Sequence, residues 1–232
     1  RIPDGRLNST QRRTTRLGSQ SASEVPYGDS ENGGHFVTGR KSRLCPSSGV
    51  LSARYTFQCT SDDHRRPLPQ RLTFGLGAHE SQTHVVLKLI AWLLFYRERL
   101  SVDTDLQNDS IPFVPDVCQL GYDLRPLLWV ECGDCSVAKL HKLASKCADA
   151  ELWIVKSSRA DADQLLRLMA REKLRRDRYH LLALDPDMVS ELTGLLRERN
   201  TVHWHSGGFE PPQMQLVFND VWVEAPFELL RF

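Results

Sequence analysis

The sequence predicts an α/β fold in which a central mixed β-sheet is flanked by helices and carries antiparallel hairpins at both ends. Three observations predict this fold. Strand-like and helix-like segments alternate through the middle of the chain, strand-like pairs stand before and after that region, and a long apolar helix precedes it. Alternating strands and helices are typical of a sheet layer covered by helices.

The first expected elements form a hairpin that begins near Val50. The segments "VLSARYTFQCT" and "QRLTFGLG" alternate apolar and polar residues, and the polar "SDDHRRPLP" stands between them as a loop. Upstream, residues 1–47 are rich in Ser, Thr, Gly, Arg and Asn and have no periodic apolar positions, so they cannot bury enough surface to fold. We therefore expect a disordered arm over 1–47 and one domain over 48–232.

A long buried helix is expected within "HESQTHVVLKLIAWLLFYRERL", residues 79–100. Apolar side chains recur there at helical spacing and also fill much of the opposite side. They are Val85, Val86, Leu87, Leu89, Ile90, Ala91, Leu93, Leu94 and Phe95. A helix that is apolar on nearly all sides is buried by its neighbours. The apolar run 85–96 is shorter than the roughly 20 residues that cross a bilayer, so we expect no membrane span.

The remaining elements follow in alternation. Two strands are expected near 113–120 and 126–132, joined through the turn-prone "GYD". After them we expect a helix over 136–147, a strand over 151–156, a helix over 160–174, a strand over 179–185, a helix over 187–198, and strands in "TVHWHS", "MQLVFN" and "VWVEA".

Composition bounds the class of protein. The chain of 232 residues is 41% hydrophobic and 25% charged, which is ordinary for a globular protein. Residues 1–47 carry eight Lys/Arg and four Asp/Glu, which leaves −3 for the remainder of a chain whose total is +1. A basic arm that binds nucleic acid is therefore an alternative for 1–47. Six cysteines without the spacing of a small secreted domain, and no recognisable signal peptide, favour a cytoplasmic setting.

Three acidic residues form the candidate site. Glu80 stands at the start of the long helix, Asp116 at the start of one strand and Glu131 at the end of the next. If these two strands pair, their acids can approach one edge of the sheet. Three carboxylates at one place suit a shared hard cation, Mg²⁺ or Mn²⁺. Without a cation, their mutual repulsion would raise at least one pKa.

A lysine-bearing helix follows the second strand. The segment "SVAKLHKLASKC" places Lys139, Lys142 and Lys146 on one side and its apolar residues on another. An ammonium group near a scissile phosphate stabilises the charge that develops during cleavage. Lys139 and Lys142 lie in the first two turns, within reach of Glu131. A solvated helix face is the plain alternative for all three lysines.

The segments "GLGAHESQTHVVLKLIAWLLFYRERL" and "SIPFVPDVCQLGYDLRPLLWVECGDCSVAKLHKLA", and the chain onward to its end, resemble the YaeQ family. This bacterial family is assigned to the PD-(D/E)XK nuclease-like superfamily. The resemblance covers roughly residues 50–232. It implies a nuclease-like core and a Mg²⁺-dependent site that cleaves phosphodiesters.

The family's functional positions map onto this sequence one by one. Its helix acid matches Glu80, its Pro-Asp pair matches Asp116 and its second strand acid matches Glu131. The superfamily lysine, expected two residues later, is replaced by Gly133. The resemblance therefore implies Glu80, Asp116 and Glu131 as metal ligands, with Asp116, Glu131, Lys142 and its neighbour Lys139 as catalytic residues.

Two functions are therefore open for the predicted site. The first is a Mg²⁺-dependent nuclease. The second is a catalytically inactive nuclease-fold protein that binds nucleic acid or a protein partner, since Gly133 removes the usual lysine. Alternatively, these acids bind no metal: Glu80 then only interacts favourably with the helix dipole, and Asp116 is only a strand-entry residue.

A third hypothesis rests on "CGDC", in which Cys132 and Cys135 have CxxC spacing. A structural zinc site needs four ligands, and no second pair at suitable spacing accompanies this one. A redox pair would need a lowered thiol pKa. His203 and His205 alternate in "HWH" and would face the same side of a strand, where we expect them to be edge-strand residues.

Overall fold

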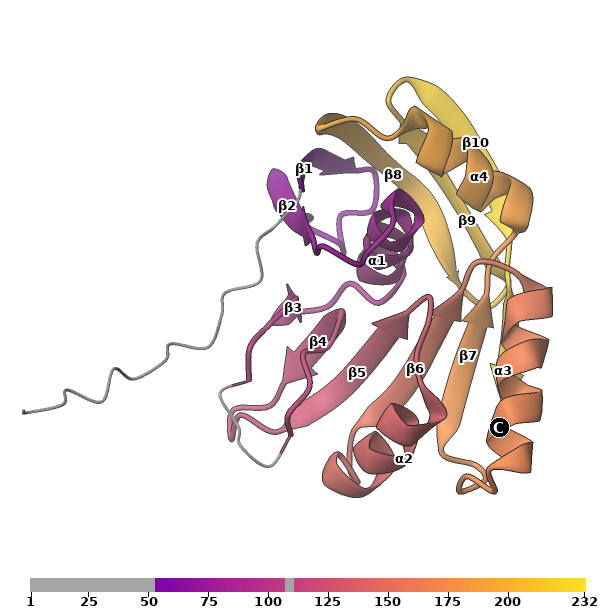
Figure 1. Cartoon of the computed structure of the whole chain (residues 1–232). Helices are drawn as coiled ribbons and strands as arrows, with labels where there is room; N and C mark the ends of the chain where they lie inside the picture. The colour runs from indigo at the N-terminus through magenta and orange to yellow at the C-terminus, as the bar shows by residue number, and fades with distance from the viewer. Residues whose placement is uncertain (1–52, 107–110) are drawn as a thin grey trace, which may run out of the picture. The chain divides into compact units, whose positions relative to one another are not determined.

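The computed structural model describes residues 53–106 and 111–232 (Figure 1). The predicted arm 1–47 and its boundary with the domain lie outside the described residues. Within these two ranges the chain forms an α/β structure of two mixed β-sheets and four helices. The α/β prediction is therefore confirmed, but the prediction of a single central sheet was wrong.

The first sheet has five strands in the order β10-β9-β8-β1-β2. They are β1 (Ala53–Ser61), β2 (Arg71–Leu76), β8 (Arg199–Phe209), β9 (Pro212–Phe218) and β10 (Val221–Pro226). The hairpin of β1 and β2 is antiparallel as predicted. Parallel pairing of β1 with β8 joins the predicted terminal hairpins into a separate sheet, which explains why there are two sheets.

The second sheet has six strands in the order β11-β7-β6-β5-β4-β3. They are β3 (Leu100–Val102), β4 (Val117–Leu120), β5 (Pro126–Cys132), β6 (Glu151–Lys156), β7 (Tyr179–Ala183) and β11 (Glu228–Arg231). Strands β5, β6 and β7 run parallel, and the other pairs are antiparallel. The sequence patterns did not predict β3 or β11, which are short edge strands.

Helix α1 (Gln82–Leu94) lies between the two sheets (Figure 1). All ten residues from Val85 to Leu94 are buried, which confirms the predicted buried helix. Ser81 caps its N-terminus by accepting a hydrogen bond from the backbone of His84 at 3.3 Å. Helix α4 (Pro186–Leu195) packs beside α1 in the same layer. Together they fill the larger hydrophobic core.

Helices α2 (Val137–Lys146) and α3 (Arg159–Arg171) belong to a second core on the opposite face of the six-stranded sheet. Strand β5 therefore has a core on each side, with Val130 facing α1 and Trp129 facing α2. None of the helices in the described part of the chain has the length and apolarity needed to cross a membrane.

The position of β8 corrects one prediction. His203 and His205 do share one side of this strand, with ring centroids 4.4 Å apart. However, β8 pairs with both β9 and β1, so these histidines are not edge-strand residues. Because its parallel partner β1 lies far away in the sequence, no local sequence pattern predicts this pairing.

Candidate metal centre

Three side chains from two distant segments meet at the tip of α1. Glu80 immediately precedes the capping residue Ser81, His84 lies in the first turn of α1, and Asp116 immediately precedes β4. The Nε2 atom of His84 lies 2.8 Å from Asp116 Oδ1 and 3.4 Å from Glu80 Oε1. One ligand atom from each residue lies within 4.8 Å of the other two. We call this group the α1-tip cluster.

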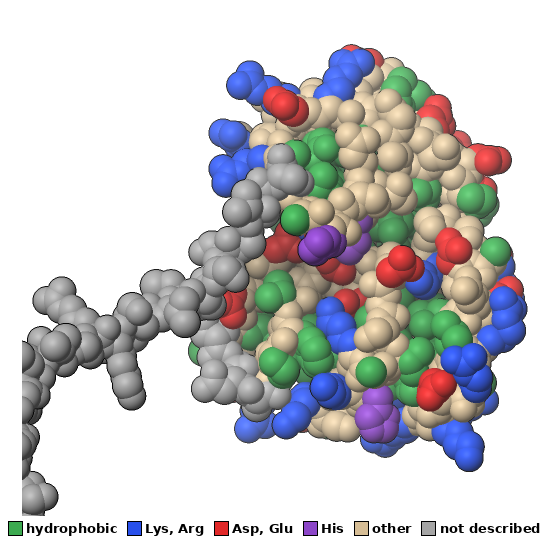
Figure 2. All heavy atoms as spheres, viewed as in Figure 1, with side chains coloured by type: hydrophobic (Ala, Val, Ile, Leu, Met, Phe, Trp, Pro, Cys, Tyr) green, Lys and Arg blue, Asp and Glu red, His purple; other side chains and the backbone are tan. Residues whose placement is uncertain are grey.

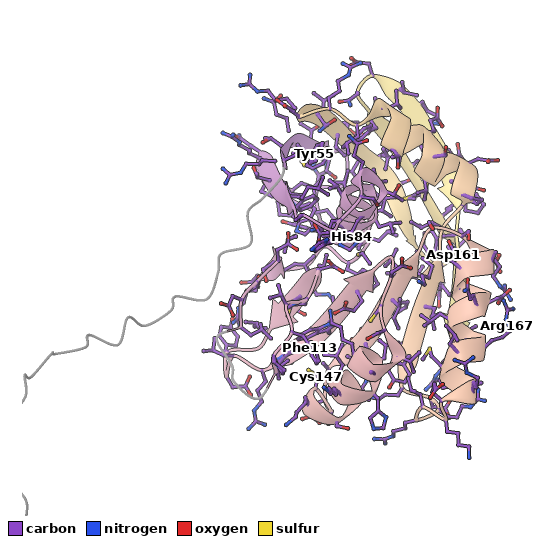
Figure 3. The ribbon with its side chains drawn as sticks, in the orientation of Figure 1. Tyr55, His84, Phe113, Cys147, Asp161 and Arg167 are labelled. Atoms are coloured by element: carbon purple, nitrogen blue, oxygen red, sulfur yellow. The ribbon has the colours of Figure 1, made fainter. Side chains whose placement is uncertain are left out.

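The α1-tip cluster lies on an accessible part of the molecule. Figure 2 shows Asp/Glu and His side chains next to one another on this face, and Figure 3 labels His84 in the same orientation. The side chains of Glu80, His84 and Asp116 are 30%, 17% and 13% exposed. They are thus partly shielded from water but still reachable by an ion or a substrate.

The second oxygen of each acid is fixed by a backbone donor. Asp116 Oδ2 accepts a hydrogen bond from the backbone of Cys132 at 2.7 Å, at the end of β5. Glu80 Oε2 accepts one from the backbone of Gly77 at 2.8 Å. These bonds leave Asp116 Oδ1 and Glu80 Oε1 directed at His84. The acids are therefore held in place by the chain around them.

His84 was not predicted as a site residue. It follows Glu80 by four positions, a spacing that brings side chains together at a helix start, and this is the signal that could have found it. Burial alone would lower the pKa of His84, but the hydrogen bond and charge of Asp116 outweigh burial and raise this pKa, with a smaller contribution from Glu80. A protonated imidazole at this position would offset the negative charge of the two acids.

A buried lysine supports the cluster from inside. Lys88, one turn beyond His84, is 1% exposed and places its Nζ 3.1 Å from both carboxylate oxygens of Asp103 and 3.5 Å from Glu80 Oε2. Burial alone would lower the pKa of Lys88, but the charges of Asp103 and Glu80 outweigh it and raise this pKa. Neither Lys88 nor Asp103 was predicted to belong to the site.

Glu131 lies beside the α1-tip cluster but outside it. Its side chain is 5% exposed and points toward α2, where Oε2 lies 2.6 Å from Lys139 Nζ. Its other oxygen accepts a hydrogen bond from Trp129 Nε1 at 2.6 Å. Burial raises the pKa of Glu131, the charge of Lys139 opposes this, and the nearby charge of Asp116 adds to it. The two strand acids are thus electrostatic neighbours.

The predicted lysines differ in their surroundings. Lys139 is 23% exposed, pairs with Glu131 and lies over the ring of Phe113, 5.6 Å from its centroid. Lys142 and Lys146 are exposed. Within 53–106 and 111–232, Lys142 forms no ion pair or hydrogen bond. Of the two lysines implied by the resemblance, Lys139 is the one in contact with a strand acid.

The CxxC pair has the wrong electrostatics for redox chemistry. Burial raises the pKa of the Cys135 thiol to about 12 and that of Cys132 well above its usual value. A redox pair needs a lowered pKa, so that a thiolate forms near neutral pH. In the described part of the chain, neither cysteine belongs to a group of three metal-ligating side chains.

Comparisons with known proteins agree with this architecture. The model of the YaeQ protein family matches residues 50–205. The crystal structure of YaeQ protein from Xanthomonas axonopodis pv. citri superimposes with a TM-score of 0.58 at 16% identity, covering 79% of this chain and 99% of that one. YaeQ protein from Pseudomonas syringae gives 0.60 at 16% identity, covering 78% and 96%.

No curated protein matches the sequence. At 16% identity, the two crystal structures establish a shared fold. The family match itself spans more than half of the chain. The chain therefore belongs to the YaeQ family.

Proposed function

We propose that this chain is a metal-dependent phosphodiesterase of the nuclease class. The observation that carries the proposal is the convergence of Glu80, Asp116 and His84 at the tip of α1, beside the ion pair of the buried Glu131 with Lys139. A divalent-cation cluster next to an ammonium group suits a reaction in which negative charge grows on a phosphate. The six-stranded sheet with its helices would then be a nuclease-like core.

The ligand chemistry favours Mn²⁺ over Mg²⁺. Carboxylate oxygens from Glu80 and Asp116 suit both ions, but the imidazole of His84 is a softer ligand than Mg²⁺ prefers. All three ligand atoms already lie within 4.8 Å of one another. Bound there, the ion would polarise a phosphoryl oxygen as a Lewis acid. Glu131 would act from the adjoining position, as an added negative charge or through a water.

Lys139 would supply the cation that the superfamily places two residues after the strand acid. Gly133 occupies that position in this chain. Glu131 holds the ammonium group of Lys139 at 2.6 Å, and the ring of Phe113 flanks it. A phosphate that entered the site would compete for that ammonium group. Lys142, exposed one turn further along α2, would contact the backbone of the same nucleic acid.

One observation favours an inactive nuclease fold that binds nucleic acid or a protein partner. Every acid at the site already has an internal partner: His84 for Asp116, Lys88 for Glu80 and Lys139 for Glu131. The negative charges of such a site are compensated without a metal ion. This second function keeps the fold and the surface but dispenses with the reaction.

Calorimetry with Mn²⁺ and Mg²⁺ tests the metal site. We expect Mn²⁺ binding in the wild type and its loss in Asp116→Asn, a change that keeps the shape of the side chain. Asp123→Asn, an exposed acid of the β4–β5 turn, is the matched control and should bind as the wild type does. Equal and negligible heats in all three proteins would remove the metal site.

A cleavage assay separates the enzyme from the binding protein. Single- and double-stranded DNA and RNA would be incubated with the protein and Mn²⁺. We expect cleavage that falls by about 100-fold or more in Lys139→Met. The exposed Lys146→Met control should keep wild-type cleavage. Retained binding without any cleavage, in the wild type as in the variants, would favour the second function.

A further inference from the structure

A second group of ligating side chains lies on the five-stranded sheet. Asp62 follows β1 directly and donates its backbone N–H to the carbonyl of Trp204 at 2.9 Å, which ties it to β8. His203 Nε2 lies 3.1 Å from Asp62 Oδ1, and His205 Nδ1 lies 2.7 Å from Asp62 Oδ2. One ligand atom from each of the three lies within 4.8 Å of the others.

This group is separate from the α1-tip cluster. Val202 and Trp204 alternate with the two histidines along β8 and belong to the core that packs on α1. Because successive side chains on a strand point to opposite faces, His203 and His205 lie on the face away from α1. The imidazoles are 34% and 31% exposed and Asp62 is 57% exposed. A solute can therefore reach all three.

A β-bulge and a neighbouring tryptophan position the side chain of His205. The register of β8 against β9 shifts between Trp204 and Ser206, so β8 has a bulge at His205. Bulges re-aim side chains and are frequent beside functional sites. The ring of His205 lies 4.7 Å from that of Trp222 on β10, which supports it from the side.

Thr60 orients His203 in the way that metal-binding histidines are oriented. Its hydroxyl lies 2.7 Å from His203 Nδ1. A ligating histidine donates its other ring N–H to a neighbouring acceptor, which fixes the tautomer and directs the free nitrogen at the ion. His203 has two tautomers at this contact; in the one whose Nδ1–H donates to Thr60, the Nε2 lone pair is available to an ion beside Asp62.

We propose that Asp62, His203 and His205 form a binding site for a divalent transition metal of the Zn²⁺, Ni²⁺ and Cu²⁺ class. Two imidazoles and one carboxylate are the ligand types that these ions take. Ligands that bind one ion at about 2.0–2.1 Å are themselves separated by about 3.0–3.4 Å. The 3.1 Å between His203 Nε2 and Asp62 Oδ1 has that spacing. His205 Nδ1 lies 2.7 Å from the other oxygen, Oδ2, so the exposed carboxylate would bind through both oxygens or turn slightly to present one.

The three protein ligands leave positions of the ion open. Asp62 is the most exposed of the three, so the open positions face solvent. Closed structural zinc sites have four protein ligands, whereas sites with three keep a position for water or an exogenous ligand. The proposed site is therefore an open one, able to take a water or a small anion.

The test uses tag-free protein titrated with Zn²⁺ against a chromophoric chelator, and with Cu²⁺ while tryptophan fluorescence is followed. The titrations are made in an Asp116→Asn background, which removes a ligand of the α1-tip cluster, so that Zn²⁺ bound there is not counted. In this background we expect one Zn²⁺ to bind in competition with the chelator, and Cu²⁺ to quench emission from the adjacent Trp222. The double variant His203→Gln/His205→Gln should weaken Zn²⁺ binding by at least about 10-fold, and Thr60→Val by about 10-fold, because outer partners of metal ligands are worth 10–100-fold.

Three controls make the result specific. His141→Gln removes an exposed histidine from α2, and His84→Gln removes the histidine of the α1-tip cluster; both should keep the Zn²⁺ affinity of this site. Trp222→Phe should bind Zn²⁺ but show weaker quenching by Cu²⁺, because Trp204 remains between the two histidines. If the double variant does not fold by circular dichroism, the exposed Asp62→Asn takes its place. Unchanged affinity in the ligand variants, or no binding by the wild type, would overturn the proposal.

Discussion

At the scale of single residues, the acids of the α1-tip cluster and its neighbour Glu131 are stable together because each has its own partner. Asp116 contacts His84, Glu80 lies near Lys88 and Glu131 pairs with Lys139. Like charges that meet without compensation push a carboxyl pKa upward and destabilise the fold. Here the partners come from α1 and α2, so the same helices that build the two cores also balance the charge. An entering cation would replace the contact between His84 and Asp116.

A pH-dependent loss of stability is expected from His180. This side chain stacks on Trp153 with ring centroids 4.7 Å apart. Burial lowers its pKa, and the charge of Arg231 lowers it further. The unfolded chain therefore binds a proton at a higher pH than the folded chain does. The stability contributed by neutral His180 is present above the unfolded pKa of about 6.5 and is lost as pH falls through the folded pKa.

Urea unfolding of the wild type and His180→Phe between pH 8 and pH 5 measures this effect. The variant keeps a stacked ring but cannot titrate, so its stability should fall less on acidification. The difference should stay below about 1 kcal/mol because His180 is partly exposed and its charge is screened. His141→Phe changes an exposed histidine and should retain the wild-type slope. Parallel curves for the wild type and His180→Phe would contradict the prediction.

The described cysteines should be poorly reactive in the folded protein. Burial raises the pKa of Cys59 and Cys147 to about 11 and that of Cys118 and Cys135 to about 12. Because the thiolate is the reactive form, these groups react slowly with a disulfide reagent at pH 8. The assay is best made in a Cys45→Ser background, since Cys45 lies outside the described residues.

In that background, five thiols should react rapidly only after denaturation. Rapid reaction of two thiols in the native protein would contradict the assignment of Cys132 and Cys135 as ordinary thiols with a raised pKa. It would revive the redox hypothesis.

At the scale of elements, α1 combines two functions in one segment. Its apolar residues fill the core between the sheets. Glu80, His84 and Lys88 recur every four positions, so their polar side chains lie along one face of the helix and its N-terminal extension. The apolar pattern predicted the burial of α1 but not the importance of Lys88. Its partner Asp103 lies just after the short strand β3 at a positive φ of 48°, so no periodic pattern marked either residue.

Replacing Lys88 should destabilise the protein. Lys88→Met keeps the length of the side chain but leaves Asp103 and Glu80 without their counter-charge. Removing one partner of a fully buried pair costs about 3–5 kcal/mol, and we expect a smaller loss of about 1–2 kcal/mol because the acids left behind, Asp103 and Glu80, are 38% and 30% exposed. Guanidinium unfolding measures the loss.

A double-mutant cycle identifies its cause. Adding Asp103→Asn to Lys88→Met should recover part of the stability, because the stranded charge is removed with its partner. Lys146→Met on the exposed side of α2 should change the free energy of unfolding by less than about 0.5 kcal/mol. If Lys88→Met cost no more than this control, the ion pair would have no structural importance.

Most elements could be predicted because their patterns are local. The hairpin of β1 and β2 follows from alternation around a polar loop, and α1 to α4 each begin after a capping Ser or Asp. Strand β3 has three residues and β11 has four, too few for a pattern of alternation. Contacts such as that of Thr60 with His203 could not be predicted either, for a different reason. They depend on segments that are adjacent only after folding.

At the scale of the whole molecule, one non-local pairing determines the architecture. Residues 56–61 of β1 pair in parallel with 199–204 of β8, which makes two sheets from segments expected to share one. That pairing also encloses α1 between the sheets and brings Asp62 next to His203 and His205. The site on β8 thus depends on this long-range contact, whereas the α1-tip cluster depends on the approach of α1 to the start of β4. Local sequence patterns could not predict the pairing of β1 with β8.

Metal binding at the α1-tip cluster should stabilise the whole domain. Its ligands come from the start of α1 and from the entry to β4, which unfolding would separate, so an ion that binds only the folded state raises the free energy of unfolding. At a free concentration of 100 times Kd, the gain is about 2.7 kcal/mol. Thermal unfolding with increasing Mn²⁺ measures it as a rise in the melting temperature.

The variants show which site is responsible for the rise. Asp116→Asn should abolish the Mn²⁺-dependent part, because it removes a ligand that links β4 to α1. His203→Gln/His205→Gln should leave that part intact, since those residues lie on the other face of the five-stranded sheet. If the Mn²⁺-dependent rise in melting temperature persisted in Asp116→Asn but disappeared in the double variant, Mn²⁺ would bind on β8. The proposal that the α1-tip cluster binds this ion would then be wrong.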